Sequence, residues 1–222
     1  MVTTRRDVVH EVDSLTSLRA AIAYSNSHPG PDTIIFDSAF FGTKRRTIRL
    51  TRGPLVLTDP ATTTIIGPGA RFLSISGGRK SRVFDIEGGS LALEGVTITG
   101  GRADRGGGIW NEGGRLSLTD VILRNNSARA LGGGLFNSGA ATLTDVSVVG
   151  DSARVGGGIA NYGTMSLTDV TKRGNTARVG SGLFNTRRAT LAWLRSRARG
   201  AHQLGFPSNY RRTHHESHRS EV

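Results

Sequence analysis

The chain has 222 residues, 31 glycines, no cysteine and a formal net charge of +12. This length favours a single domain, and the absence of cysteine excludes a disulfide framework, a thiol nucleophile and any thiolate metal site. No stretch approaches the roughly 18 apolar residues that a membrane-spanning helix needs. Because 36% of the residues are hydrophobic but only 6% are aromatic, branched aliphatic side chains must supply most of the core.

Residues 1–31 form a first segment with one predicted helix. Asp13 and Ser14 offer an N-cap, and apolar residues follow them at helical spacing. We therefore predict a helix from Ser14 to Ser25 that caps the structure downstream. The first seven residues show neither the apolar segment nor the cleavage site of a secretory signal, which taken alone favours the cytoplasm.

Short strands are predicted between residues 32 and 90. In this region runs of β-branched and alternating residues are separated by Gly and Pro, as at Gly67-Pro68-Gly69. The predicted strands are Thr33–Phe36, Thr47–Leu50, Leu55–Leu57, Thr64–Ile66, Phe72–Ile75 and Val83–Ile86.

From about residue 91 the chain repeats itself with a period of about 24 residues. A phrase of glycines, one aliphatic residue and a later Asn occurs four times, for example at Gly132–Asn137, with steps of 26, 24 and 24 residues. A Leu-Thr-Asp-Val phrase and an Asn/Asp-Ser/Thr-Ala-Arg phrase each recur three times in the same order. Three phrases in a fixed order at one period indicate a solenoid.

A period of this length is typical of a leucine-rich repeat or of a parallel β-helix. The units lack a leucine ladder and a helical arc, and their short alternating runs are broken by Gly, Asn and Asp. We therefore predict an all-β, single-stranded parallel β-helix over residues 32–192, with roughly seven coils that each rise by about 4.8 Å. Equivalent residues then stack in columns, and one column is a structural ladder of side-chain amides: Asn111, Asn137, Asn161 and Asn185.

The repeat pattern ends abruptly after Leu191. Residues 193–222 show neither alternation nor a helical stripe and are rich in Arg and His, so we predict an irregular, disordered basic tail. A shifted or truncated reading frame would explain the break. Lys172 is a second departure, because alternation points it inward at the position held by Leu123 and Val148, and burying an unpaired ammonium group is costly.

Two parts of the chain resemble known families. The phrases Gly132–Leu135 and Arg173–Ala177, with their copies, resemble the repeats of polymorphic outer-membrane proteins. The segment Thr16–Ile22 is similar to the N-terminal capping motif named for Cys-Ser-Leu-Arg-Glu-Ala, with Thr16 in place of Cys and Ala20 in place of Glu. Together the resemblances cover about residues 14–190, and they imply a right-handed parallel β-helix that is extracellular or attached to a bacterial cell envelope.

One candidate site is the column formed by the Asp of the Leu-Thr-Asp phrase. Stacked carboxylates attract cations and raise one another's pKa, and parallel β-helix lyases and hydrolases of acidic polysaccharides use such groups for calcium binding or acid–base catalysis. An Asx turn at the end of a strand explains the same residues without any activity. These candidates, called the Asp row below, are Asp120, Asp145 and Asp169.

A second candidate is a column of Arg side chains. A row of guanidinium groups about 4.8 Å apart would hold a sulfated or carboxylated polymer, and a solvated turn is the alternative. The aromatic residues Trp110, Phe136 and Phe184 share another column, which would stack on sugar rings if it points outward or would pack beneath a loop. The Arg residues, called the Arg row below, are Arg129, Arg154 and Arg178.

The sequence thus favours a non-catalytic repeat protein that presents an extended surface for adhesion or glycan contact, with polysaccharide or envelope components as partners and no cofactor. A polysaccharide lyase or glycoside hydrolase on the same fold is the alternative, with calcium as its cofactor, because one fold hosts many functions. No specific nucleic-acid module is recognisable, so the positive charge supports only nonspecific attraction of polyanions.

Overall fold

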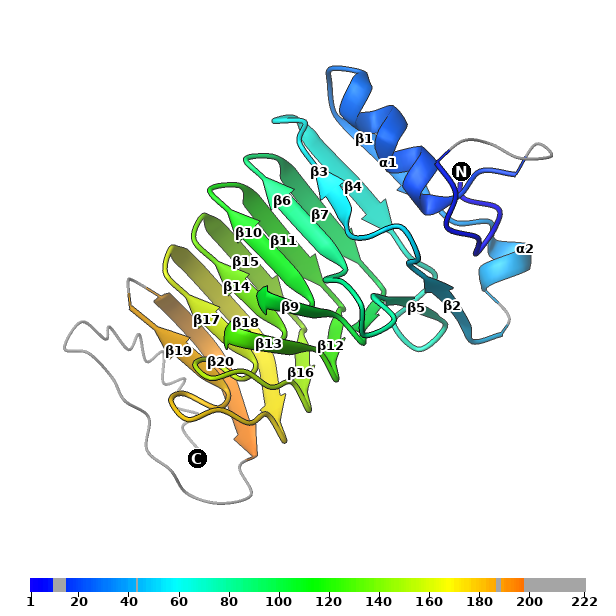
Figure 1. The fold of residues 1–222 in the computed structure, drawn as a ribbon. Coiled ribbons are helices and arrows are strands. Elements are labelled where there is room, and N and C mark those ends of the chain that lie inside the picture. The colour runs from blue at the N-terminus through cyan, green and yellow to red at the C-terminus, as the bar shows by residue number, and fades with distance from the viewer. Residues whose placement is uncertain (10–14, 43, 187–188, 198–222) are drawn as a thin grey trace, which may run out of the picture.

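The computed structural model describes residues 1–9, 15–42, 44–186 and 189–197, which form a parallel β-solenoid of about six turns, close to the roughly seven expected (Figure 1). Each turn of the solenoid, called a coil below, passes through three faces. Neighbouring coils pair in parallel along all three faces. The predicted all-β fold class is therefore confirmed, with helices confined to the N-terminal part among the described residues.

The first and second faces belong to one 12-stranded sheet. The first face contains β1 (Asp32–Ile35), β4 (Thr62–Ile66), β7 (Ser90–Glu94), β11 (Arg115–Thr119), β15 (Ala140–Thr144) and the first half of β18 (Thr164–Arg173). The second face contains β2 (Arg46–Arg49), β5 (Leu73–Ser76), β8 (Thr97–Thr99), β12 (Ile122–Arg124), β16 (Ser147–Val149) and the second half of β18.

The third face is a six-stranded sheet made of β3 (Leu55–Leu57), β6 (Phe84–Glu87), β10 (Ile109–Glu112), β14 (Leu135–Asn137), β17 (Ile159–Asn161) and β19 (Leu183–Asn185). A small sheet of β9 (Arg102–Arg105) and β13 (Ser127–Leu131) lies in the connection from the second face to the third. The strands predicted upstream of residue 90 match observed strands to within two residues at each end.

Equivalent residues of the repeat stack as the period requires. Ile109 pairs with Leu135 on the third face, and Ile159 pairs with Leu183 two coils further on. On the first two faces the inward positions are likewise aliphatic, and side chains such as Leu118 are fully buried. The core is a continuous column of branched aliphatic residues, so most of the fold's stability comes from apolar surface removed from water.

The predicted Asn ladder is confirmed. Asn111 Nδ2 donates to Asn137 Oδ1 at 2.6 Å, Asn137 Nδ2 donates to Asn161 Oδ1 at 2.7 Å, and Asn161 Nδ2 donates to Asn185 Oδ1 at 2.7 Å. Ile86 takes the ladder position in the preceding coil, so the Oδ1 atom of Asn111 is buried and has no hydrogen-bond partner. The ladder therefore begins where the regular repeat begins.

The N-terminal helix is present, but its predicted bounds were wrong. Helix α1 covers Leu18–Ser27, and its N-cap is Ser17, whose Oγ accepts a hydrogen bond from the Ala20 N–H at 3.0 Å. Thr16 exchanges hydrogen bonds with Thr3, and this pairing holds the chain outside the helix at that point. The predicted N-cap residues Asp13 and Ser14 lie outside the described residues. A second, four-residue helix, α2 (Ser38–Phe41), was not predicted.

Arg19, on helix α1, connects the N-terminal segment (residues 1–31) to the first coil. This guanidinium binds the Asp7 carboxylate at 2.6 Å and also donates to the carbonyl oxygens of Gly53 and Pro54. Burial alone would raise the pKa of Asp7, but Arg19 and the backbone N–H groups of Thr51 and Arg52 lower it, and the net pKa lies below its ordinary value. Together with the buried Leu18 and Ile22, this contact holds helix α1 against the first coil.

Two features at the C-terminal side concern the predicted break in the repeat. Strand β20 (Ala189–Arg197) pairs in register with β18, so the boundary placed at residue 192 was too early by five residues; residues 198–222 lie outside the described part of the chain.

Lys172 points inward as predicted and is only 6% exposed. Burial lowers its pKa to about 8. Neither helix in the described ranges is long and apolar enough to cross a membrane.

Candidate functional site

The Arg row lies on three stacked connections between the second face and the third. Each connection, called an Arg turn below, follows a second-face strand and leads into a glycine-rich entry to the third face: 126–131, 151–155 and 175–179. Backbone hydrogen bonds join successive Arg turns, for example from Ala153 N–H to Thr176 O and from Arg178 N–H to Arg154 O. The stacking places one Arg side chain at each coil.

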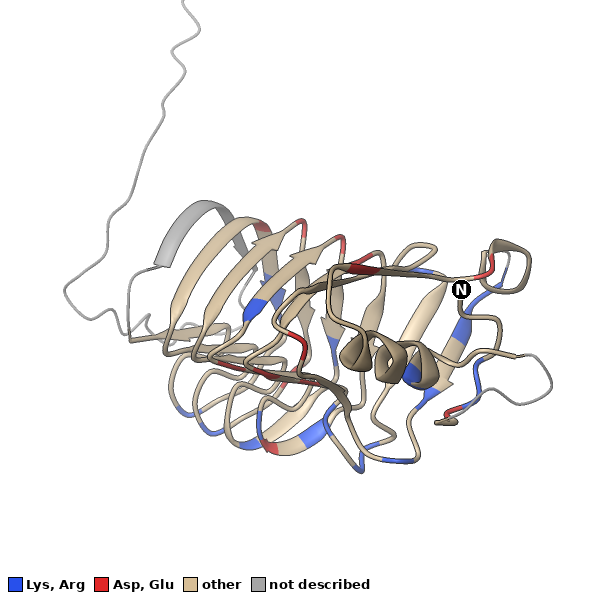
Figure 2. Cartoon of the chain, turned by 90° about the horizontal axis from the view of Figure 1, so that it is seen from above, with Lys and Arg blue, Asp and Glu red and all other residues tan. Residues whose placement is uncertain are grey.

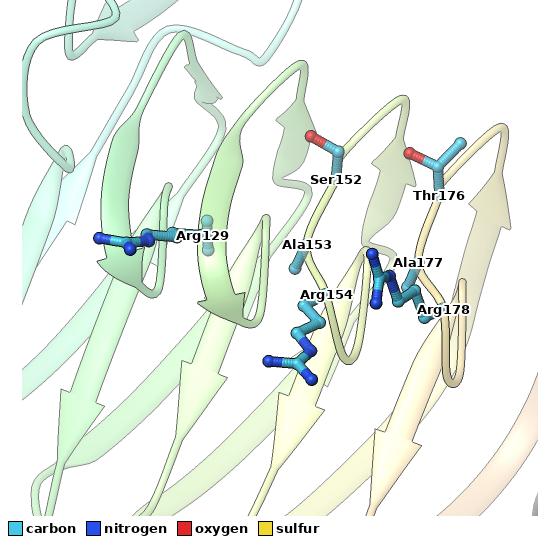
Figure 3. A pocket seen from close by; sticks show the side chains of 8 residues that line it. Arg129, Ser152, Ala153, Arg154, Thr176, Ala177 and Arg178 are labelled. Atoms are coloured by element: carbon cyan, nitrogen blue, oxygen red, sulfur yellow. The ribbon is translucent and has the colours of Figure 1, made fainter.

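The Arg side chains border an open hollow on the outside of the solenoid (Figure 3). Apart from the Arg row, its lining consists of small residues: Ala128, Ser152, Ala153, Thr176 and Ala177. Because the other lining residues are small, the Arg side chains are the longest groups at the hollow (Figure 3). The Arg row is exposed and forms no ion pair with any residue that the structure describes.

The charges around this hollow are strongly biased. The connections between second and third faces from residue 77 to residue 182 carry the exposed cations Arg79, Lys80, Arg102 and Arg105 in addition to the Arg row, and their single exposed carboxylate is Asp104. Figure 2 shows the Lys and Arg segments gathered along the lower edge of the coils, while several Asp and Glu segments mark the opposite edge. This edge therefore carries a positive field that follows the long axis of the solenoid.

A second ladder, which the sequence did not predict, lies beneath the Arg turns. Its members are the first residues of the three Arg turns, and it is called the inner ladder below: Asn126, Asp151 and Asn175. Asp151 Oδ1 accepts from the Asn126 backbone N–H at 2.6 Å and from Asn126 Nδ2 at 3.0 Å, and the Asp151 N–H donates to Asn175 Oδ1 at 2.8 Å. Each Arg turn is thus anchored to the next through the side chain of a ladder member, buried at Asp151 and half-buried at Asn175.

Asp151 is the unusual member of this ladder. It is fully buried, and its Oδ2 atom has no hydrogen-bond partner. Burial raises the pKa of this carboxyl to about 7, although the two Asn126 donors partly oppose the shift. The recurrence of Asn or Asp at these three positions was visible in the sequence. Because the residues that follow them are those of an exposed polar turn, nothing indicated that their side chains point inward.

The Asp row occupies a tight corner between the first and second faces. All three residues are exposed, and their backbone φ angles of 49°, 54° and 53° lie in the left-handed region. Gly95 takes the same corner in the preceding coil with a φ of 63°. Since Gly and Asp both tolerate this conformation, the corner alone explains why Asp120, Asp145 and Asp169 recur.

No group of three or more His, Asp or Glu side chains within the described residues could hold a metal ion. Calcium therefore stays a prediction that goes with the alternative activity. The Asp row remains a set of separate carboxylates, one per coil, on the side of the second face opposite to the Arg turns.

The aromatic column is largely packed. Trp110, Phe136, Ala160 and Phe184 are in register on the third face. Phe136 is only 6% exposed and lies beside the Tyr162 ring, with 5.5 Å between the ring centroids. The Arg82 guanidinium lies 4.1 Å from the Trp110 ring centroid and bonds to Asp85 at 2.8 Å. These contacts favour packing of the column over a free stacking platform.

Comparison with known proteins gives no relative: no family model matches the chain, and no curated protein or solved structure does so either.

Proposed function

We propose that this chain is a non-catalytic β-solenoid repeat protein that binds acidic glycans along its Arg turns, at a cell envelope or outside the cell. The observation that carries the proposal is the Arg row, one exposed guanidinium per coil with no ion pair in the described part of the chain. Guanidinium groups form paired hydrogen bonds with carboxylate and sulfate-like oxygens. An extended polyanion lying along the solenoid axis would meet one such group at each coil.

Two further features support an extended rather than a compact ligand. The hollow is open and is floored by small residues, which suits a polymer that lies across it. The positive edge continues over several coils (Figure 2). The resemblance of the repeat phrases to polymorphic outer-membrane proteins supports the proposed envelope or extracellular setting.

The test is binding of a panel of polymers measured by calorimetry: dextran sulfate, polygalacturonate and neutral dextran. We expect the two acidic polymers to bind with an affinity that falls as salt rises, and neutral dextran not to bind. Exposed ion pairs contribute about 0.2–1 kcal/mol each, so Arg154→Ala with Arg178→Ala should weaken binding by about two- to thirty-fold.

A matched control removes the same charge elsewhere. Arg45→Ala with Arg115→Ala also deletes two exposed cations, and these residues lie outside the Arg turns. If the control pair weakens binding as much as the Arg154 and Arg178 pair, net charge rather than the Arg row holds the polymer, and the proposed surface is wrong. Release of unsaturated uronate from polygalacturonate with calcium, lost in Asp145→Ala, would instead establish the lyase alternative.

A further inference from the structure

The inner ladder is complete at Asn126 and Asn175 but lacks a donor at Asp151. Asn126 Nδ2 donates to the Ile98 carbonyl oxygen at 3.1 Å, and Asn175 Nδ2 donates to the Val148 carbonyl oxygen at 2.9 Å. Each amide therefore holds its Arg turn to a second-face strand as well as to Asp151. Both carbonyls are on backbone positions of the second face that lie in the same column.

The missing partner of Asp151 follows from the strand register. Leu123 pairs with Ile98 on one side and with Val148 on the other, so the Leu123 carbonyl, one coil before Asp151, is the acceptor in the equivalent position for Asp151. A carboxylate oxygen accepts hydrogen bonds but cannot donate one. The Oδ2 atom of Asp151 is buried without a partner, whereas a protonated carboxyl would have an O–H to donate.

We propose that Asp151 is a proton-operated latch for the Arg turn that carries Arg154, closed when its carboxyl is protonated and loosened when the carboxyl ionises. The protonated form supplies the one donor that the inner ladder lacks. The ionised form places a charge without a counter-ion in the buried inner ladder, with one of its two oxygens unpartnered. Such a charge is costly, and the cost is relieved when the turn opens to water. The effect of the latch on glycan binding rests on the proposed function. The protonation-dependent opening of the turn does not depend on that function.

The surroundings of Asp151 leave it as the group that titrates. Gly134 lies directly above Oδ2, where an added Cβ would come within 2.8 Å, and the two neighbouring ladder members are neutral amides. The Arg side chains of its own turn and the adjacent turns are exposed, and the other inward cation nearby, Lys172, packs one coil further on against Gly182. Burial raises the pKa of Asp151 to about 7, so the latch works near neutral pH.

The direction of the effect follows from linkage. A carboxyl whose folded-state pKa is raised from 3.8 to about 7 stabilises the closed turn at low pH, and this stabilisation is lost as the pH rises toward 7. Between about pH 5.5 and about pH 8.5, the opening equilibrium of the turn should increase about thirty-fold, if the open turn titrates at the ordinary value.

The experiment is hydrogen exchange of the backbone amides of residues 152–155 at those two pH values, corrected for intrinsic exchange, in the full chain. We expect the wild type to lose about thirty-fold protection in this turn at the higher pH. Asp151→Asn restores a permanent Nδ2 donor in nearly the same shape and should keep its protection at both values. Asp145→Asn, an exposed corner carboxylate, is the matched control and should behave as the wild type.

The proposal is overturned if protection of 152–155 in the wild type does not depend on pH, or if Asp151→Asn shows the same dependence. Dextran sulfate affinity is measured on the same samples and should fall at the higher pH in the wild type more than in Asp151→Asn. Exchange that follows the expected pattern without any polymer binding at either pH supports the latch and refutes the proposed glycan function. Polymer binding without pH-dependent exchange refutes the latch and supports the proposed glycan function.

Discussion

Replacing the buried Lys172 is the most direct test of how the interior of the solenoid is packed. Its side chain points inward in the column of Leu123 and Val148 and is 6% exposed. Burial lowers its pKa from 10.5 to about 8, so the folded protein disfavours the charged form by about 3 kcal/mol at neutral pH. Lys172→Leu should therefore stabilise the fold by about 2–3 kcal/mol, which for a chain of this size raises the Tm by roughly 5–10 °C.

The assay is thermal unfolding followed by circular dichroism, with the exposed neighbour Arg173→Leu as the control that should change stability by no more than about 0.5 kcal/mol. The folded-state pKa of Lys172 is depressed, so its cost is full below about pH 8 and disappears as the pH rises to 10.5. The advantage of Lys172→Leu should shrink over that window. An unchanged or lower Tm at pH 7 would show that the ammonium group is not confined in the core.

Three further changes address the ladder, the corner and the cap. Asn137→Ala breaks two buried amide hydrogen bonds and should lower the free energy of unfolding by about 2–4 kcal/mol in urea; a loss under 1 kcal/mol would mean that the ladder adds little. Asp145→Gly keeps the left-handed corner and should be nearly neutral, whereas Asp145→Val should cost about 1–2 kcal/mol; equal effects on Tm would refute the turn role. Asp7→Asn weakens the contact with Arg19. The stability that this contact gives the wild type is lost as the pH falls below 3.8, and the variant should lack it at every pH. If stability falls with acid in the variant as it does in the wild type, the contact is contradicted.

The stacking of the repeat could be predicted because it depends on period alone. Once three phrases recur at one spacing, each residue must lie above its copy, and the Asn ladder and the column of Ile109 and Leu135 follow. The inward orientation of Lys172 followed from its place in the column of Leu123 and Val148, although the corner at Asp169 breaks the alternation along β18 between Leu167 and Val170. These successes required no knowledge of how the coil bends.

The roles of other residues depend on backbone bends that break alternation. Asp120 sits in a left-handed corner, and beyond such a corner counting by twos no longer tells which face a side chain takes. Gly150, directly before Asp151, is likewise left-handed with a φ of 68°, so Asp151 reads as an ordinary turn residue in the sequence although it is buried. The start of helix α1 was misplaced because the pairing of Thr16 with Thr3 is a tertiary contact, which outweighs a local N-cap signal.

The corner between the first and second faces also determines where the chain can change length. The distance along the chain from the last buried Leu of the first face to the inner ladder is eight positions in each regular coil: Leu118 to Asn126, Leu143 to Asp151 and Leu167 to Asn175. The connections on either side of the third face vary, since Asn111 precedes its Leu by seven positions and Asn137 precedes its Leu by six.

Strands paired on both sides of the corner leave no slack for an extra residue, because a one-residue shift would turn every following side chain to the opposite face. Insertions should therefore be tolerated in the Arg turns and beside the third face, but not between Leu118 and Asn126. The surface that carries the Arg row can thus be lengthened or replaced by another loop while the rest of the coil stays unchanged, which makes it the natural place to graft a new binding segment.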